Sequence, residues 1–158
     1  MKTNDFIAWQ TYVTAQTEAI LQRTLPEKTT TPHILHEAMR YSALDGGKRL
    51  RPLLVWATSE LGHCVQAACE AAMAAVECIH VYSLVHDDMP AMDNDNLRRG
   101  KPTNHVQFGE AMALLVGDAL QALAFDVLSQ PTELSTDRQL KMIQILAQAS
   151  GSLGMAGG

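Results

Sequence analysis

Three aspartates that stand close together are the residues of this sequence best suited to chemistry. Asp87, Asp88 and Asp93 read Asp-Asp-x-x-x-x-Asp, and four of the nine aspartates in the 158-residue chain fall between positions 87 and 95. Carboxylate oxygens suit Mg²⁺, which keeps waters or substrate phosphates in its remaining positions. The glycine and final glutamate of an EF-hand loop are missing. The cluster therefore suggests a magnesium site, with a solvated acidic loop as the alternative.

The first two of these aspartates should lie at the end of a helix that Pro90 terminates. The negative end of the helix dipole disfavours carboxylates there. Two adjacent like charges add a further cost, so a positive group is expected nearby. Because the proline breaks the helix, the chain can bulge and bring Asp93 back toward Asp87.

Two basic clusters accompany the aspartates. They hold six of the 12 lysines and arginines, namely Lys48, Arg49 and Arg51, and Arg98, Arg99 and Lys101. Gly46 and Gly47 allow the backbone to approach a ligand. Lys48 and Arg51 can clamp an anion, since arginine donates as a two-pronged fork. Either cluster alone is most often a solvated surface, but both beside one carboxylate site predict a metal-bridged diphosphate and a second, metal-free one.

Two histidines precede the aspartates on the same predicted helix. His80 lies seven residues before Asp87 and so shares its face. We expect His80 to contact a diphosphate, although such a histidine is more often packed in the core. His86 points about 100° away from Asp87 and is expected to be a core residue.

The spacing of apolar residues predicts helices along the whole sequence. Expected helices cover residues 4–24, 32–44, 51–62, 65–88 and 105–128, with a last helix after the linker at 129–136. Thr31 is the expected N-cap of the second helix, and Thr136 with Gln139 forms an expected capping box for the last. Residues 89–103 form a charged loop. No convincing β-alternation is found, so the predicted fold class is all-α.

Composition narrows the class of protein. Apolar residues make up 47% of the chain, which is enough for a hydrophobic core, and the net charge of −5 argues against nucleic acid as the main partner. No uninterrupted apolar run reaches the roughly 18 residues of a membrane span. The N-terminal stretch MKTNDFIAWQTYVT lacks the apolar segment of a signal peptide. We therefore expect a cytoplasmic protein with no membrane partner.

Three stretches of the sequence carry a family resemblance. GGKRLRP, HVYSLVHDDMPAMDNDNLRRGKPT and VGDALQALAF closely resemble the trans-isoprenyl diphosphate synthases, and most closely the bacterial farnesyl diphosphate synthases among them. The resemblance extends from about residue 31 to the C-terminus and rests on several ordered motifs with matching spacing. It implies an isoprenoid-synthase-type bundle of long antiparallel helices around a central cavity, and usually a homodimer.

The resemblance also implies roles for individual residues. Asp87, Asp88 and Asp93 match the first aspartate-rich motif, which holds Mg²⁺, or Mn²⁺ as a substitute, against the allylic diphosphate. Asp87 and Asp93 are the implied direct ligands. Arg98 matches the arginine that binds the allylic diphosphate and completes the implied catalytic set. The residues that match the binding site for isopentenyl diphosphate are Lys48, Arg51, His80 and Arg99.

The implied reaction condenses isopentenyl diphosphate with dimethylallyl or geranyl diphosphate to farnesyl diphosphate. The C–O bond of the allylic diphosphate ionises with the help of the metal, and the isopentenyl double bond attacks the allylic cation. Tyr82 matches a bulky position that forms the cavity floor in the family, with core packing as the alternative, and small Ser83 leaves less to block growth. The other readings are a geranylgeranyl or longer-chain synthase, and a non-catalytic synthase-like subunit or fragment.

The sequence departs from the family because the second aspartate-rich motif is missing, as are the later lysine that helps to bind the allylic diphosphate and several cavity-forming helices. After Asp118 only Asp126 and Asp137 remain, and the final GSLGMAGG resembles a family segment that continues directly into Gln-x-x-Asp. Residues 1–158 are therefore expected to be the N-terminal portion of one polyprenyl synthetase domain. A part of a longer protein and a naturally short protein both stay open, and the 158-residue chain alone is expected to be inactive.

Overall fold

The structure is a computed structural model that describes residues 3–44 and 46–158. Within these ranges the regular elements are α1 (Thr3–Thr24), α2 (His33–Ala43), α3 (Leu50–Ser59), α4 (Gln66–Asp87), β1 (Leu97–Arg98), β2 (Lys101–Pro102), α5 (Asn104–Phe108), α6 (Glu110–Ser129), α7 (Thr136–Ser150) and the 3-10 helix η1 (Met155–Gly157). The predicted all-α class is confirmed, because β1 and β2 are a single ribbon of two-residue strands.

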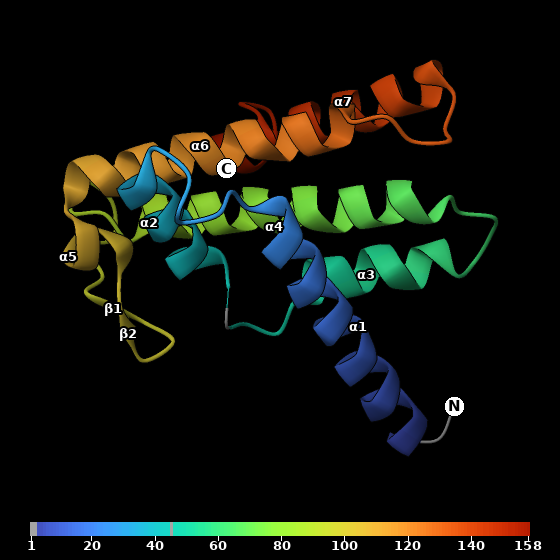
Figure 1. The fold of residues 1–158 in the computed structure, drawn as a ribbon, viewed down its shortest axis with the longest axis horizontal. Coiled ribbons are helices and arrows are strands. Elements are labelled where there is room, and N and C mark those ends of the chain that lie inside the picture. Colours follow the sequence, from blue (N-terminus) through green and yellow to red (C-terminus); the bar gives the residue numbers. More distant parts are fainter. Residues whose placement is uncertain (1–2, 45) are drawn as a thin grey trace.

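Helix α4 is the central element of the bundle (Figure 1). Helices α3 and α6 lie along it and run in the opposite direction, and α7 lies against α6. Helix α1 contacts both α3 and α4, and α2 contacts α4 and α6. The C-terminal end of α4, the short α5 and the β1–β2 ribbon gather at one end of the bundle, on the left in Figure 1.

Small residues explain how α4 can be surrounded. Alanine is the best helix former, and Ala74 is fully buried. One core cluster includes Tyr82 of α4 and Leu120 of α6, and a second includes Met73 of α4 and Leu53 of α3. Because α4 is packed on more than one side, the end of the helix that carries the aspartates is held in a fixed position.

The predicted N-cap of α2 is wrong. Pro32 occupies the cap position and no side chain caps the helix. The hydroxyl of Thr31 instead lies 3.4 Å from Nε2 of His33. A threonine hydroxyl binds whichever local partner the backbone allows, so its presence before a helix does not ensure a cap.

The predicted capping box of α7 is also wrong. The helix begins at Thr136 without a side-chain cap. The side-chain amide of Gln139 donates to the carbonyl of Leu128 at 2.8 Å, and it also donates to the carbonyl of Gln130. These carbonyls end α6, where backbone acceptors have no partner within the helix. Gln139 therefore satisfies the end of α6 rather than the start of α7.

The helix predicted over residues 105–128 is divided in two. Helix α5 ends at Phe108, and Gly109 has a φ of 89°. Glycine adopts this conformation without a steric penalty, so α6 begins as a new helix at Glu110. The charged loop is found as predicted, apart from the β1–β2 ribbon, whose two-residue strands are too short to show an alternating pattern.

Two helices are long and apolar enough to cross a membrane by length and composition alone, namely α4 and α6. In α4, 61% of the most apolar window is buried inside the bundle, as in the core helix of a soluble protein. The corresponding share in α6 is 33%, and its Leu114 and Leu115 are about half exposed. On α7, Leu140 and Ile145 are exposed as well. Helices α6 and α7 thus present apolar side chains on the surface.

Candidate active site

The chain turns back on itself directly after α4. The amide of Asp93 donates to the carbonyl of Asp87 at 2.8 Å, and the amide of Asp95 donates to the carbonyl of Asp88 at 3.1 Å. Pro90 lies within this reversal and cannot continue the helix. The predicted return of Asp93 toward Asp87 is therefore confirmed for the backbone.

The three aspartates of the motif differ in what surrounds them. Asp93 is exposed and Asp87 is half-buried, whereas Asp88 is 3% exposed. Both oxygens of Asp88 accept from Arg98, whose Nε lies 2.8 Å from Oδ2 and whose Nη2 lies 2.6 Å from Oδ1. This fork raises the pKa of Arg98. Arg98 is thus the positive group expected near the end of α4, and both carboxylate oxygens of Asp88 are occupied by this ion pair.

A tight hairpin carries the second basic cluster. Arg98 pairs with Lys101 across the ribbon, so Arg99 and Gly100 form its two-residue turn. Both turn residues have positive φ, 53° and 77°. A type I′ turn requires this combination, and its twist matches that of the flanking strands. Arg98 thus lies at the end of β1, where its side chain reaches Asp88 at the end of α4, and Arg99 lies at the tip of the ribbon.

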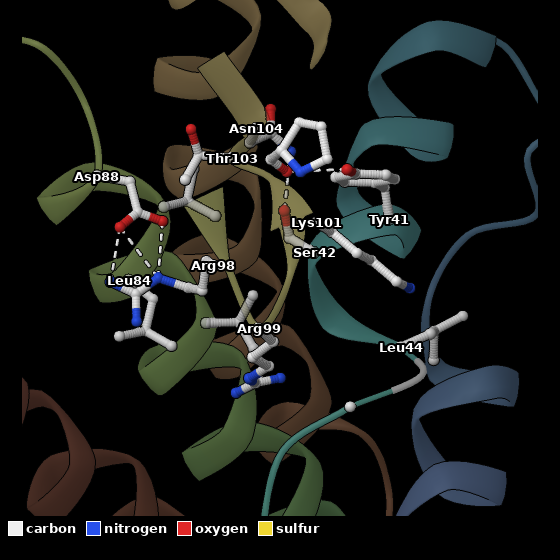
Figure 2. Close-up of a pocket in the computed structure, with 14 residues that line it drawn as sticks. Tyr41, Ser42, Leu44, Leu84, Asp88, Arg98, Arg99, Lys101, Thr103 and Asn104 are labelled. Carbon is white, nitrogen blue, oxygen red and sulfur yellow. Dashed lines mark hydrogen bonds and ion pairs between the residues drawn. The ribbon is translucent and has the colours of Figure 1, made fainter. Parts of the chain in front are cut away.

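Helix α2 fixes the ribbon from the other side of a pocket, which Figure 2 shows. The hydroxyl of Tyr41 donates to the carbonyl of Pro102 at 2.8 Å. The side-chain amide of Asn104 donates to the carbonyl of Ala38 at 2.9 Å and to Oγ of Ser42 at 2.8 Å. Sequence reasoning missed Tyr41 and Asn104, because neither residue carries a charge or belongs to a spaced motif.

The Arg99 side chain lies against the glycines of the loop between α2 and α3. A Cβ added to Gly47 would lie 2.7 Å from Nη2 of Arg99, and one added to Gly46 would lie 3.2 Å from Nη1. Gly47 also has a φ of 90°. Glycine is therefore required at Gly47 both for its backbone conformation and for the approach of Arg99. The contact brings the two basic clusters together.

His80 lies among the same cations. Burial lowers the pKa of His80, and the charges of Arg51, Arg99 and Arg98 lower it further, while Glu77 opposes the shift. The contact of His80 with a diphosphate stays a prediction. A neutral imidazole among guanidinium groups provides hydrogen-bonding groups for an anion without adding a further repulsive charge.

The remaining residue of the predicted anion site is Lys48, which is exposed in the loop beside Gly47. Its neighbour Arg49 was missed as a site residue. Arg49 is 2% exposed, and its guanidinium lies 2.7 Å from a carboxylate oxygen of Glu77 in α4. A signal for Glu77 was present, because a carboxylate in a largely apolar central helix must find a partner when buried.

Tyr82 and Ser83 lie on α4 one turn before the aspartates. Tyr82 is 8% exposed within the main core cluster, and its ring meets the edge of His86 with the centroids 5.7 Å apart. The hydroxyl of Ser83 donates to the carbonyl of His80 at 2.8 Å. Nε2 of His86 lies 3.1 Å from the carbonyl of Leu114 in α6, so His86 packs between helices as predicted. The role of Tyr82 and Ser83 in product length stays a prediction.

The donor set at the end of α4 fits a hard divalent cation. Within the described part of the chain, no three His, Cys, Asp or Glu side chains converge closely enough to hold a metal by themselves. Mg²⁺ is usually held by one or two carboxylates together with waters and substrate phosphates. Asp87 and Asp93 would supply these two carboxylates, because the chain reversal joins them and Asp88 is already bound to Arg98.

Several known proteins are similar to this chain in sequence and in fold. The Polyprenyl synthetase family model matches residues 32–156. The chain is 58% identical over 124 residues to a farnesyl diphosphate synthase of Escherichia coli, a match that covers 77% of this chain and 42% of that protein. It is 55% identical over 121 residues to a farnesyl diphosphate synthase of Haemophilus influenzae, with 77% and 41% covered.

Solved structures agree with these matches. The FPP/GFPP synthase of Zymomonas mobilis superposes with a TM-score of 0.91 at 49% identity, covering 99% of this chain and 56% of that one. A geranyltransferase of Legionella pneumophila gives 0.87 at 42% identity, with 92% and 52% covered. The chain spans about two fifths of the curated relatives that it matches. From its motifs, its helical bundle and these matches, the chain belongs to the polyprenyl synthetase family.

Proposed function

We propose that this chain carries the first half-site of a farnesyl diphosphate synthase, a prenyltransferase that joins isopentenyl diphosphate to dimethylallyl or geranyl diphosphate. One observation carries the proposal. The end of α4 carries Asp87 and Asp93 next to Asp88, which binds Arg98, and the further cations Arg51 and Arg99 act on His80. This arrangement suits two diphosphates, one bound through a divalent cation and one bound by cations of the protein alone.

In the proposed reaction, the C–O bond of the allylic diphosphate breaks and the leaving diphosphate keeps the electron pair. Arg98, fixed by its fork to Asp88, donates to the diphosphate oxygens and stabilises their growing charge. Asp87 and Asp93 would hold Mg²⁺ or Mn²⁺, which would supply further neutralising charge for the leaving diphosphate.

The second substrate completes the proposed reaction. Isopentenyl diphosphate is held by Arg51, His80, Arg99 and Lys48. Its double bond then faces the allylic carbon. The double bond attacks that carbon, a new C–C bond forms, and the charge moves to the former double bond. This new carbocation loses a proton from its adjacent carbon to the departing diphosphate, which restores a double bond. Holding both reactants in this orientation removes much of the entropic barrier of a bimolecular step.

The fifteen-carbon product is supported by the farnesyl diphosphate synthases at 55–58% identity. Geranylgeranyl pyrophosphate synthases of plants, such as that of Capsicum annuum at 49% identity, are more distant and carry the alternative of a longer product. A buried aromatic ring at Tyr82 suits a floor that stops chain growth. A Tyr82→Ala enzyme that still released only fifteen-carbon product would contradict this part of the proposal.

The test of the proposed site is calorimetric titration of the chain with dimethylallyl diphosphate and, separately, isopentenyl diphosphate, with and without Mg²⁺. In Asp87→Ala we expect the Mg²⁺-dependent binding of the allylic substrate to be lost while the binding of isopentenyl diphosphate survives. Asp126→Ala, which removes an exposed carboxylate of α6, is the matched control. Allylic binding that needs neither Mg²⁺ nor Asp87 would contradict the metal assignment.

We further propose that the protein works as a homodimer in the cytoplasm. The half-exposed leucines of α6 and the exposed apolar residues of α7 support a protein contact. The free thiols of Cys64, Cys69 and Cys78 support the cytoplasm, where cysteines stay reduced. Sedimentation of the purified protein tests the first part, and fractionation of cells that express it tests the second.

A further inference from the structure

Arg49 is buried at a point where four helices meet. Its side chain is 1% exposed. The guanidinium donates to Oε1 of Glu77 in α4, to Oε2 of Glu18 in α1 and to the carbonyl of Ala43 at the end of α2, each at 2.7 Å. The next residue, Leu50, starts α3. One side chain therefore joins α1, α2 and α4 to the beginning of α3.

The backbone of Arg49 is held in an unusual conformation. Its φ of 48° and ψ of 35° lie in the left-handed region, which a residue with a Cβ adopts only at an energetic cost. Such a conformation persists where the surrounding contacts hold it. At Arg49 the three bonds of the guanidinium supply these contacts.

We propose that Arg49 and Glu77 form a positioning pair, which holds the loop from Gly46 to Arg51 in the conformation that binds the metal-free diphosphate. The pair touches no substrate and acts through the loop. The inference rests on the proposed function, since it gives the loop the role of an anion site.

The surroundings of Glu77 support this role. Glu77 is 2% exposed, and within the described ranges its Oε2 accepts no hydrogen bond. Glu77 lies three residues before His80 on α4, and its charge opposes the lowering of the pKa of His80 and of Arg99. Glu77 therefore neutralises Arg49 and also balances the cations of the site before an anion arrives.

Positioning explains this pair better than stability does. The cost of removing two charges from water offsets most of their attraction, so apolar residues of similar volume often stabilise a fold equally well. An apolar pair, however, does not donate to the Ala43 carbonyl or hold the loop. Replacing both residues should therefore preserve the bundle and release the loop.

The experiment compares the wild-type chain with the double variant Arg49→Met, Glu77→Met. Thermal unfolding reports the bundle, hydrogen exchange of peptides over residues 44–52 reports the loop, and calorimetry with inorganic diphosphate in EDTA reports the site. We expect similar unfolding temperatures, faster exchange confined to the loop, and diphosphate affinity weaker by about ten-fold or more. Unchanged loop exchange and unchanged affinity would overturn the proposal.

Arg40→Met is the matched control. Arg40 also donates to several carbonyls between α1 and α2, including those of Gln22 and Leu25, but it does not contact the loop. It should leave the diphosphate affinity unchanged. If Arg40→Met weakens binding as much as the double variant does, the pair has no specific role and the proposal is overturned.

Two further outcomes are decisive as well. If the double variant fails to fold, Arg49→Lys replaces it. A lysine keeps the charge but cannot reach all three acceptors. If loop exchange and diphosphate affinity in Arg49→Lys equal those of the wild type, the proposal is overturned. If the wild-type chain binds no diphosphate, the proposed anion site fails. The hydrogen exchange of residues 44–52 in the double variant then still shows whether the pair holds the loop in place.

Discussion

At the scale of single residues, Asp88 has a different task from the other two aspartates of its motif. We expect Asp88→Asn to lower the free energy of unfolding by about 2 kcal/mol, because hydrogen bonds to a charged partner contribute about 1.5–3 kcal/mol. All three hydrogen bonds that the Arg98 side chain donates in the structure go to this buried carboxylate. Urea denaturation measures the change. Asp93→Asn, at an exposed position, should shift stability by no more than about 0.5 kcal/mol, and equal losses in the two variants would contradict the assignment.

His80 gives a second prediction at this scale. Burial and the neighbouring arginines lower its pKa below 6.5 in the folded chain. Between the folded pKa and 6.5, the unfolded chain therefore binds more protons, so the free energy of unfolding rises with pH in that window and falls as the pH is lowered through it. Urea denaturation from about pH 5 to pH 7.5 should show this slope in the wild type and a smaller slope in His80→Gln. Parallel pH profiles would exclude His80 as the source.

At the scale of helices, the contact between α4 and α6 depends on Gly117. A Cβ added there would lie 2.0 Å from Nε2 of His86. Glycine to alanine inside a helix ordinarily stabilises by about 1 kcal/mol. Here we expect Gly117→Ala to destabilise by about 1–3 kcal/mol, because the His86 ring must leave its position beside the carbonyl of Leu114.

The matched variant for this prediction removes the ring. Adding His86→Ala to Gly117→Ala should recover much of the lost stability, since the two residues are in contact and their effects are not additive. Thermal unfolding of the two single variants and the double variant gives the coupling. Additive losses would show that the helices accommodate the extra methyl group elsewhere.

At the scale of the whole molecule, the bundle leaves one side less covered than the others. Leu115 of α6 is 50% exposed and Ile145 of α7 is 54% exposed. We expect the chain to associate with itself through these helices, and Leu115→Gln with Ile145→Gln to weaken that association by an order of magnitude or more. Sedimentation velocity over a range of concentrations measures it. Leu61→Gln, at an exposed position after α3, is the control, and a wild-type chain that stays monomeric would remove the homodimer from the proposal.

The sequence by itself determined the helical class and the family, and it located the charged residues of the candidate site. Helix periodicity is a local property, so α1 and α4 were predicted close to their observed bounds. The aspartates and the arginine cluster lie within one short segment, and Pro90 alone indicates that the segment turns back. Its motifs carried the family resemblance, which the comparisons confirmed.

The tertiary structure decided which of these charged groups serve each other. Arg98 bonds to Asp88 because the chain reversal after α4 brings β1 back beside that helix, and Arg99 meets Gly47 of a distant loop. Gln139 satisfies α6 instead of its own helix. Arg49 joins helices that only the folded bundle brings together. Such pairings form between segments that are far apart in the chain. Helix periodicity and residue spacing describe only nearby residues, so they cannot predict which distant segments come into contact.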